Sequence, residues 1–174
     1  VCCRTAPCRL RPAAPRRLTP SNVGSRAQGP HRLKIASWNV NSLNVRMPHL
    51  SQWLREAQPD IVALQETKLE DERFPDSELA TLGYRSVFCG QKTYNGVALL
   101  SRVPFSSECI TAIPDFDDPQ KRVLAATVGD LRIVDLYVVN GEKVGSEKFE
   151  YKLRWLADVR EWLRAELQQH PNMI

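Results

Sequence analysis

The stretch IASWNVNSL, residues 35–43, decides how the fold begins. The segment from Ile35 to Val40 is typical of a β-strand that enters a core. Two asparagines, Asn39 and Asn41, stand where that strand should end. Asparagine is depleted in strands, and a buried amide without partners costs about 1–3 kcal/mol. The two amides therefore need hydrogen-bond partners at the end of this strand.

Length and composition indicate one soluble globular domain. The chain has 174 residues, of which 43% are hydrophobic and 25% charged, enough to bury a core. It contains no run of the roughly 18 apolar residues that would span a membrane. The net charge of +4 is unevenly placed, because residues 1–32 hold seven arginines and no acidic residue precedes Glu56. The rest carries 17 basic against 20 acidic side chains, so bulk charge gives no support for nucleic-acid binding.

The first 32 residues differ in kind from the rest. They are rich in proline and arginine and have neither helical nor strand periodicity. We predict a disordered extension over residues 1–32 and a folded domain over residues 33–174. An organelle-targeting peptide is the alternative, since the segment is Arg-rich and acid-free. Its prolines argue against the amphipathic helix that such a peptide needs.

The remaining chain alternates strands and helices. Patterning predicts strands over residues 33–38, 60–66, 84–89 and 96–101, a hairpin over 123–139, and helices over 47–57, 77–83 and about 147–168. This mixture predicts an α/β fold with a mixed, mostly antiparallel sheet. The apolar set of the last helix covers more than half its circumference, which predicts neighbours beyond a single contact stripe. After that helix, residues 170–174 resemble the approach to another strand, so we expect the chain to stop within the fold.

A carboxylate ends the second predicted strand. That strand is almost continuously apolar and finishes in LQET with Glu66, where a charge is costly unless it is paired, hydrogen-bonded or bound to a metal. If the first two strands are neighbours, Asn39 and Glu66 emerge side by side. An amide beside a carboxylate suits Mg²⁺. The alternative is that Glu66 caps a loop and Asn39 ties down a turn.

Other polar residues gather at strand ends and on a glycine-bounded loop. Side chains suited to phosphate contact or base stacking are Lys92, Tyr94, Asn95, Arg122, Tyr137 and Asn140. Taken singly, Tyr137 and Asn140 are equally compatible with a core tyrosine and a turn. For the others a solvated loop is the default reading, and only the joint arrangement at strand ends favours a site. The three histidines do not neighbour a plausible serine or cysteine nucleophile, which disfavours acyl-transfer chemistry.

Longer motifs carry a family resemblance. The segments KIASWNVNSL, QPDIVALQETKLEDERFP, LGYRSVFCGQKTYNGVALLS, DPQKRVLAATV and LYVVNGEKVGSEKFEYKLRWL closely resemble the exonuclease III branch of abasic-site (AP) endonucleases, within the endonuclease/exonuclease/phosphatase superfamily. SWNVN and QET are shared across that superfamily, whereas the longer motifs are specific to the DNA-repair branch. The resemblance runs in order from about Arg32 to the last residue. It implies the N-terminal half of a four-layer α/β sandwich, in which two mixed sheets stack with helices outside.

The resemblance also implies an activity. It predicts Mg²⁺-dependent hydrolysis of DNA phosphodiesters 5′ to abasic sites, with 3′–5′ exonuclease or 3′-end trimming, and Mn²⁺ is the alternative ion. The expected partner is double-stranded DNA with abasic sites or 3′ ends, bound by a cytoplasmic, nucleoid-associated monomer without membrane contact. Residues matching the family motifs are Glu66 and Tyr137 for catalysis and Asn39 and Glu66 for the metal. The predicted DNA-binding set is Asn41, Lys68, Lys92, Tyr94, Asn95, Arg122 and Asn140.

The sequence also departs from the family. Val139 stands where relatives have proline, and Asn44 where they often have arginine. The family motifs GDFN and SDH, which orient and activate the attacking water, do not occur in this chain. We therefore expect no incision by the chain alone and an apolar sheet face without a partner. The alternatives are a catalytically dead DNA-binding fragment, or a phosphoesterase acting on lipid or nucleotide, which the branch-specific motifs disfavour.

Overall fold

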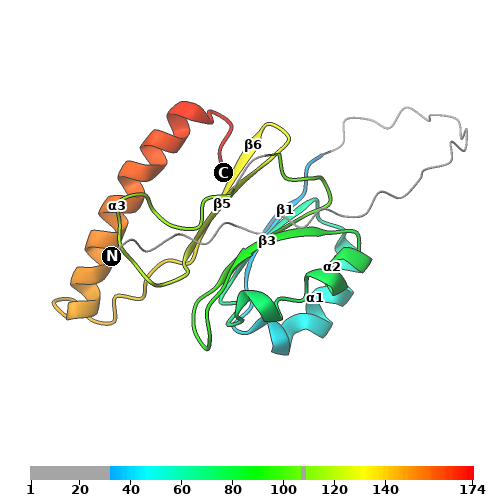
Figure 1. Cartoon of the computed structure of the whole chain (residues 1–174), viewed down its shortest axis with the longest axis horizontal. Coiled ribbons are helices and arrows are strands. Elements are labelled where there is room, and N and C mark those ends of the chain that lie inside the picture. The colour runs from blue at the N-terminus through cyan, green and yellow to red at the C-terminus, as the bar shows by residue number, and fades with distance from the viewer. Residues whose placement is uncertain (1–31, 107–108) are drawn as a thin grey trace, which may run out of the picture.

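The computed structural model describes residues 32–106 and 109–174. The elements stack in four layers, with two helices, a four-stranded sheet, a two-stranded sheet and one long helix in that order (Figure 1). This confirms the predicted α/β class and the layered arrangement. The predicted extension over residues 1–32 lies outside the described residues, apart from Arg32.

The first sheet has the strand order β1-β2-β4-β3. Its strands are β1 (Ile35–Asn39), β2 (Ile61–Gln65), β3 (Arg85–Cys89) and β4 (Val97–Ser101). β1 and β2 run parallel with Asn39 opposite Gln65, and the other pairings are antiparallel. All five residues of β2 and of β4 are buried, as expected for central strands covered on both faces. The parallel pair brings the ends of β1 and β2 to one edge of the sheet.

Two helices cover the outer face of this sheet. They are α1 (Leu43–Ala57) and α2 (Asp76–Thr81), with a 3₁₀ turn, η1 (Asp71–Arg73), before α2. α1 begins four residues before the prediction, because Leu43 belongs to its buried stripe with Met47, Leu50 and Leu54. The Leu43 N–H donates to the Thr67 carbonyl at 3.0 Å, which satisfies one of the unpaired donors at the helix start. Pro48 therefore lies inside α1 and not in its first turn.

The second sheet is the predicted hairpin. β5 (Val123–Val128) and β6 (Leu131–Leu136) pair antiparallel and turn at Gly129–Asp130. One face contributes Leu124, Ala126, Val128 and Ile133 to a core shared with the first sheet. The other face carries residues that pack against the last helix. The hairpin thus holds the two outer parts of the molecule together.

The last helix, α3 (Glu147–Gln169), covers the outer face of the hairpin (Figure 1). Ser146 caps it by accepting a hydrogen bond from the Phe149 N–H. Its buried residues are Trp155, Val159, Trp162 and Glu166, a single stripe at helical spacing. The prediction of a wider contact surface was wrong for the described residues, because Leu153, Leu156 and Leu167 are exposed. The long helix carries charged residues as well as apolar ones. Among the described residues, no helix has an apolar stretch long enough to cross a membrane.

After α3 the chain forms an isolated bridge to β6, which fits the predicted approach to another strand. The backbone of residues 172–174 pairs with Arg132 and Val134 of β6, in parallel. The expected sheet face without a partner is not found at the central strands β2 and β4, which are buried on both faces. Of the two edge strands, β1 is partly exposed. An open, mostly apolar groove of about 610 Å³ lies there, lined by Ala36, Ser37, Trp38, Arg46, His49 and Trp53.

Candidate active site

Polar residues at the ends of three strands lie together at one place. Asn39 ends β1, Glu66 directly follows β2, and Tyr137 directly follows β6 of the other sheet. The first two meet because β1 and β2 are parallel neighbours, with Asn39 opposite Gln65. Tyr137 reaches them from across the core between the sheets. The predicted pairing of Asn39 with Glu66 is confirmed at the level of geometry.

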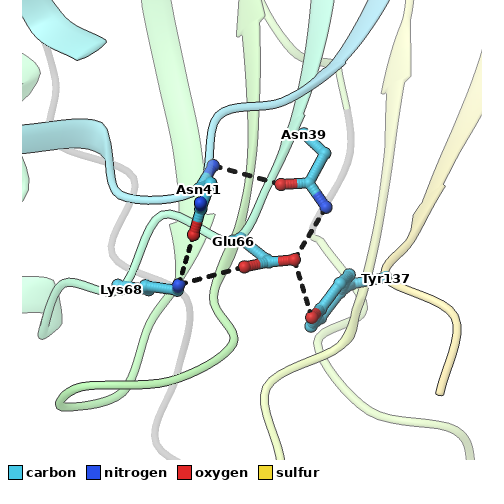
Figure 2. Close-up of polar contacts among 5 residues, drawn as sticks. All are labelled: Asn39, Asn41, Glu66, Lys68 and Tyr137. Atoms are coloured by element: carbon cyan, nitrogen blue, oxygen red, sulfur yellow. Dashed lines mark hydrogen bonds and ion pairs between the residues drawn. The ribbon is translucent and has the colours of Figure 1, made fainter. Parts of the chain in front are cut away.

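Glu66 is the centre of this cluster (Figure 2). Its Oε1 accepts hydrogen bonds from Asn39 Nδ2 and from the Tyr137 hydroxyl, each at 2.8 Å. Its Oε2 lies 3.1 Å from Lys68 Nζ, and that ammonium also donates to Asn41 Oδ1 at 2.5 Å. The Asn41 N–H in turn donates to Asn39 Oδ1 at 3.1 Å. The two asparagines of the opening stretch thus join a closed ring of contacts around one carboxylate.

The backbone around Glu66 is bent sharply to make these contacts. Asn41, Ser42, Glu66 and Lys68 all have positive φ angles, between 42° and 89°, a region costly for residues other than glycine. Strand pairing nevertheless continues past the strand ends, since the Ser42 N–H donates to the Glu66 carbonyl at 2.8 Å. Gly96 packs so closely against this turn that an added Cβ would lie 2.2 Å from Thr67 Oγ1. The surrounding structure therefore fixes the strained turn.

The cluster keeps Glu66 ionised and Tyr137 protonated. Partial burial raises the pKa of Glu66, but hydrogen bonds from Asn39, Tyr137 and Lys68, together with the Lys68 charge, outweigh it and leave that pKa lowered. Burial raises the pKa of the Tyr137 phenol, and its hydrogen bond to Glu66 raises it further. At neutral pH the site therefore holds a carboxylate and a phenol that can donate a hydrogen bond.

Arg122 supports Tyr137 from the other side. Its guanidinium carbon lies 4.6 Å from the centre of the Tyr137 ring, within cation–π range. Its Nη1 donates to the Tyr137 carbonyl at 3.2 Å and its Nε to Gln120 Oε1 at 2.8 Å. Gln120 is also bound by Tyr151 of α3, since Gln120 Nε2 donates to the Tyr151 hydroxyl oxygen at 3.2 Å. The predicted residue Arg122 thus adjoins the Glu66 cluster through Tyr137.

Other predicted DNA-binding residues are not part of the ring of side-chain contacts around Glu66. The backbone of Asn95 adjoins that ring, because the Lys68 N–H donates to the Asn95 carbonyl at 2.9 Å. Lys92 and Tyr94 are exposed on the loop between β3 and β4, Tyr94 by 67%. Asn95, on the same loop, is buried instead, and its Nδ2 donates to Gln91 Oε1 and Gln120 Oε1. Asn140 is exposed, and its Oδ1 accepts a hydrogen bond from the Glu142 N–H. The amide of Asn95 therefore fastens its own loop.

The residues that depart from the family pattern have simple local settings. Val139 is 3% exposed and packs in the core beneath α3, so it retains an apolar contact where relatives have proline. Asn44 is exposed on the first turn of α1.

Sequence reasoning missed Gln120, Gln65 and Asp135, which bind or border the cluster. Gln65 directly precedes Glu66, and this adjacency is the signal that could have found it.

The donor set at Glu66 fits Mg²⁺ in part. An ionised carboxylate beside an amide offers hard oxygen ligands, and Mg²⁺ commonly uses one or two carboxylates and keeps several waters. Within residues 32–106 and 109–174, no group of three or more His, Cys, Asp or Glu side chains could hold a metal ion. Glu66 would hold the ion, and Asn39 would orient that carboxylate.

Comparison with known proteins agrees with the fold. Residues 36–174 match the Endonuclease/Exonuclease/phosphatase family. Exodeoxyribonuclease III of Haemophilus influenzae is 34% identical over 139 residues, which are 77% of this chain and 52% of that protein. The chain spans about half the length of the curated relatives that it matches.

Two solved structures show the same architecture. The Neisseria 3′ phosphatase NExo, bound to a product DNA hairpin, is 45% identical with a TM-score of 0.79, and the match covers 82% of this chain and 55% of that one. An AP endonuclease from Archaeoglobus fulgidus is 36% identical with a TM-score of 0.74, covering 77% of this chain and 52% of that one. The four layers described above are therefore those of known nucleases over about half of their length.

Proposed function

The chain belongs to the endonuclease/exonuclease/phosphatase family, and from that membership we propose that it serves metal-dependent hydrolysis of DNA phosphodiesters in DNA repair. The proposed reactions are incision 5′ to abasic sites and trimming at 3′ ends. The observation that carries the proposal is the ionised Glu66, bound by Asn39, Tyr137 and Lys68 where two sheets meet. DNA as the substrate is supported by the similar exodeoxyribonuclease III, by NExo bound to a product DNA hairpin, and by the similar AP endonuclease.

Four residues of the cluster, together with Arg122, have a role in this proposal. Glu66 holds a divalent cation, and Asn39 fixes the orientation of that carboxylate through its 2.8 Å hydrogen bond. The protonated Tyr137 donates a hydrogen bond to an oxygen of the phosphate. Arg122 and Lys68 supply positive charge that attracts the DNA backbone. These groups bind and orient a phosphodiester next to a negative site that accepts a metal.

The metal completes the electrostatics of the site. When bound, Mg²⁺ polarises a phosphoryl oxygen and stabilises the charge on the leaving oxygen. Mn²⁺ is the alternative ion, since it also accepts carboxylate, carbonyl and water ligands.

We also propose that these 174 residues do not carry out incision by themselves. The cluster offers one carboxylate, and neither His49 nor His170, the two histidines of the described residues, is among its contacts. Hydrolysis also needs a group that takes the proton of the attacking water. Purified chain mixed with Mg²⁺ and an abasic duplex should therefore leave the duplex intact, and measurable incision would contradict this part of the proposal.

DNA binding by the chain tests the site directly. We expect a labelled abasic duplex to gain fluorescence anisotropy on addition of the chain, with an affinity that falls as salt rises. Arg122→Ala and Lys68→Ala should each lower the salt slope by about 1. Arg160→Ala is the matched control, because Arg160 is exposed on α3 and pairs with Glu161. Equal slopes for all three variants would contradict a phosphate contact at this site.

A lipid substrate is the competing reading within the same family. Vesicles containing a phosphoinositide offer a phosphate without a base or a duplex. Preferential binding of the chain to such vesicles over abasic DNA would overturn the DNA proposal. Preferential binding to DNA with an intact salt slope would support it.

A further inference from the structure

We propose that Gln65 and Asp135 form a buried link between the two sheets that positions Glu66 against Tyr137. Gln65 is the last residue of β2, and Asp135 lies in β6 of the other sheet. Gln65 Nε2 donates to Asp135 Oδ1 at 2.6 Å and to Ser37 Oγ of β1 at 3.1 Å. The two hydrogens of this amide nitrogen therefore link β2 to both β1 and β6.

The link lies directly beside the Glu66 cluster. Gln65 precedes Glu66 in sequence, so any shift of the Gln65 side chain is passed to the turn that follows β2. Asp135 stands two residues before Tyr137, and residues two apart in an extended strand point to the same face. The Gln65–Asp135 contact and the Glu66–Tyr137 contact are thus two consecutive bridges between the same pair of segments. Removing the first bridge should loosen the second.

Burial of the Asp135 carboxyl carries a desolvation cost that core packing alone does not explain. Asp135 is 2% exposed, and its Oδ2 has no hydrogen-bond partner. Burial raises the pKa of this carboxyl to about 7, although hydrogen bonds from Gln65 and from the Ala98 backbone partly oppose that shift. An apolar side chain at this position would avoid the desolvation cost. The contact with Gln65 is therefore a better explanation of Asp135 than core packing is.

Gln65 likewise makes polar contacts that core packing would not require. It is 9% exposed and lies among otherwise apolar residues of β2. Its two donor contacts fix the side chain to β1 and β6 at once. The same two strands deliver Asn39 and Tyr137, the residues that donate to Glu66 Oε1. Gln65 and Asp135 are thus positioning residues for that carboxylate.

This inference deepens the proposed function and rests on it for its chemical meaning, but the positional effect can be measured without metal or DNA. The ring ¹³C–¹H signal of Tyr137 is assigned by its loss in Tyr137→Phe. Its displacement in Glu66→Gln then measures the contact between the two side chains. In Asp135→Leu we expect the signal to move toward its place in Glu66→Gln. In Asp135→Asn, which keeps an oxygen acceptor for Gln65, it should stay near the wild-type position.

Two further variants control for fold and stability. Cys89→Ala alters the same core between the sheets at a free, buried thiol, and it should leave the Tyr137 signal in place. If Asp135→Leu alone fails to fold, the double variant Gln65→Leu with Asp135→Leu replaces both partners by apolar groups, which is nearly neutral for stability. A folded variant that lacks the link and keeps the wild-type Tyr137 signal would overturn the inference.

A metal titration separates this inference from the proposed function. Mn²⁺ binding to the wild-type chain should weaken about 10-fold in Asp135→Leu and stay unchanged in Cys89→Ala. If the wild-type chain binds no Mn²⁺, the metal proposal fails, while the Tyr137 signal still decides the link. If Mn²⁺ binds equally well to the wild type and to Asp135→Leu, the link does not position the site.

Discussion

The Tyr137 hydroxyl donates a 2.8 Å hydrogen bond to Glu66 Oε1, although the two residues are 71 positions apart and follow strands of different sheets. The same oxygen accepts from Asn39 Nδ2, and Lys68 Nζ lies 3.1 Å from the other oxygen. All three neighbours donate hydrogens, so the negative charge of Glu66 organises the site. Charge-assisted hydrogen bonds of this kind are stronger than neutral ones.

Glu66→Gln should abolish tight metal binding. The substitution keeps the size of the side chain but removes its charge, and a neutral amide is a poor ligand for a hard divalent ion. We expect Mn²⁺ affinity measured by calorimetry to fall at least about 10-fold. Glu161→Gln on the exposed side of α3 is the control. Unchanged Mn²⁺ affinity in Glu66→Gln would show that the metal binds elsewhere.

Asp135 should make the stability of the chain depend on pH. Its pKa is raised from an ordinary value of 3.8 to about 7 in the folded protein. Between these values the unfolded chain loses the proton while the folded chain keeps it, so stability falls as pH rises. At about 1.4 kcal/mol per pH unit, the total loss is roughly 4 kcal/mol.

Asp135→Asn removes this titration. Urea unfolding of both proteins across the range from pH 4 to pH 8 measures the difference between them. We expect the wild type to lose stability relative to the variant as pH rises toward 7, and the difference to level off above that. Parallel stability curves for the two proteins would contradict a raised pKa at Asp135.

The sequence predicted the part of the site that depends on neighbouring strands. Asn39 and Glu66 were expected side by side if the first two strands were neighbours, and the parallel pairing of β1 with β2 does bring them together. The place of Tyr137 depends on how the second sheet stacks on the first, and no local pattern carries that information. Asp135 was missed for the same reason, since its partner Gln65 is 70 residues away.

Packing against distant elements also decided where the helices differ from prediction. α1 begins at Leu43 because the carbonyl of Thr67 is at hand to accept its N–H, a contact that sequence spacing does not reveal. On α3, hydrophobic periodicity identified Trp155 and Trp162, which are buried, but also Leu167, which is 51% exposed. Periodicity gives the apolar positions of a helix, whereas burial depends on what lies opposite each of them.

Glu166→Ala should be strongly destabilising. Glu166 Oε2 accepts a 2.8 Å hydrogen bond from Arg132 Nε in the core beneath α3, and both side chains are less than 10% exposed. Removing one partner of a buried ion pair costs about 3–5 kcal/mol, because the other charge stays buried. Glu161→Ala on the same helix should cost far less, since its pairs with Arg160 and Arg164 are exposed and screened by solvent. Urea unfolding compares the two, and similar costs would show that Glu166 is not the buried anchor of α3.

Gly96→Ala should disturb both the stability and the site. Gly96 has a φ of 88°, and an added Cβ would lie 2.2 Å from Thr67 Oγ1, one residue after Glu66. Gly129→Ala is the matched control, because Gly129 has a φ of 63° with nothing within 4 Å of the added Cβ. In Gly129→Ala the free energy of unfolding should fall only by the backbone strain, about 1–2 kcal/mol. Gly96→Ala has similar strain and in addition overpacks the turn, which costs about 1–3 kcal/mol more. Urea unfolding should show the larger loss for Gly96→Ala, and its Tyr137 ring signal should move while that of Gly129→Ala stays in place. Equal losses of stability in the two variants, with an unmoved Tyr137 ring signal in both, would mean that the turn after β2 can adjust without moving Glu66.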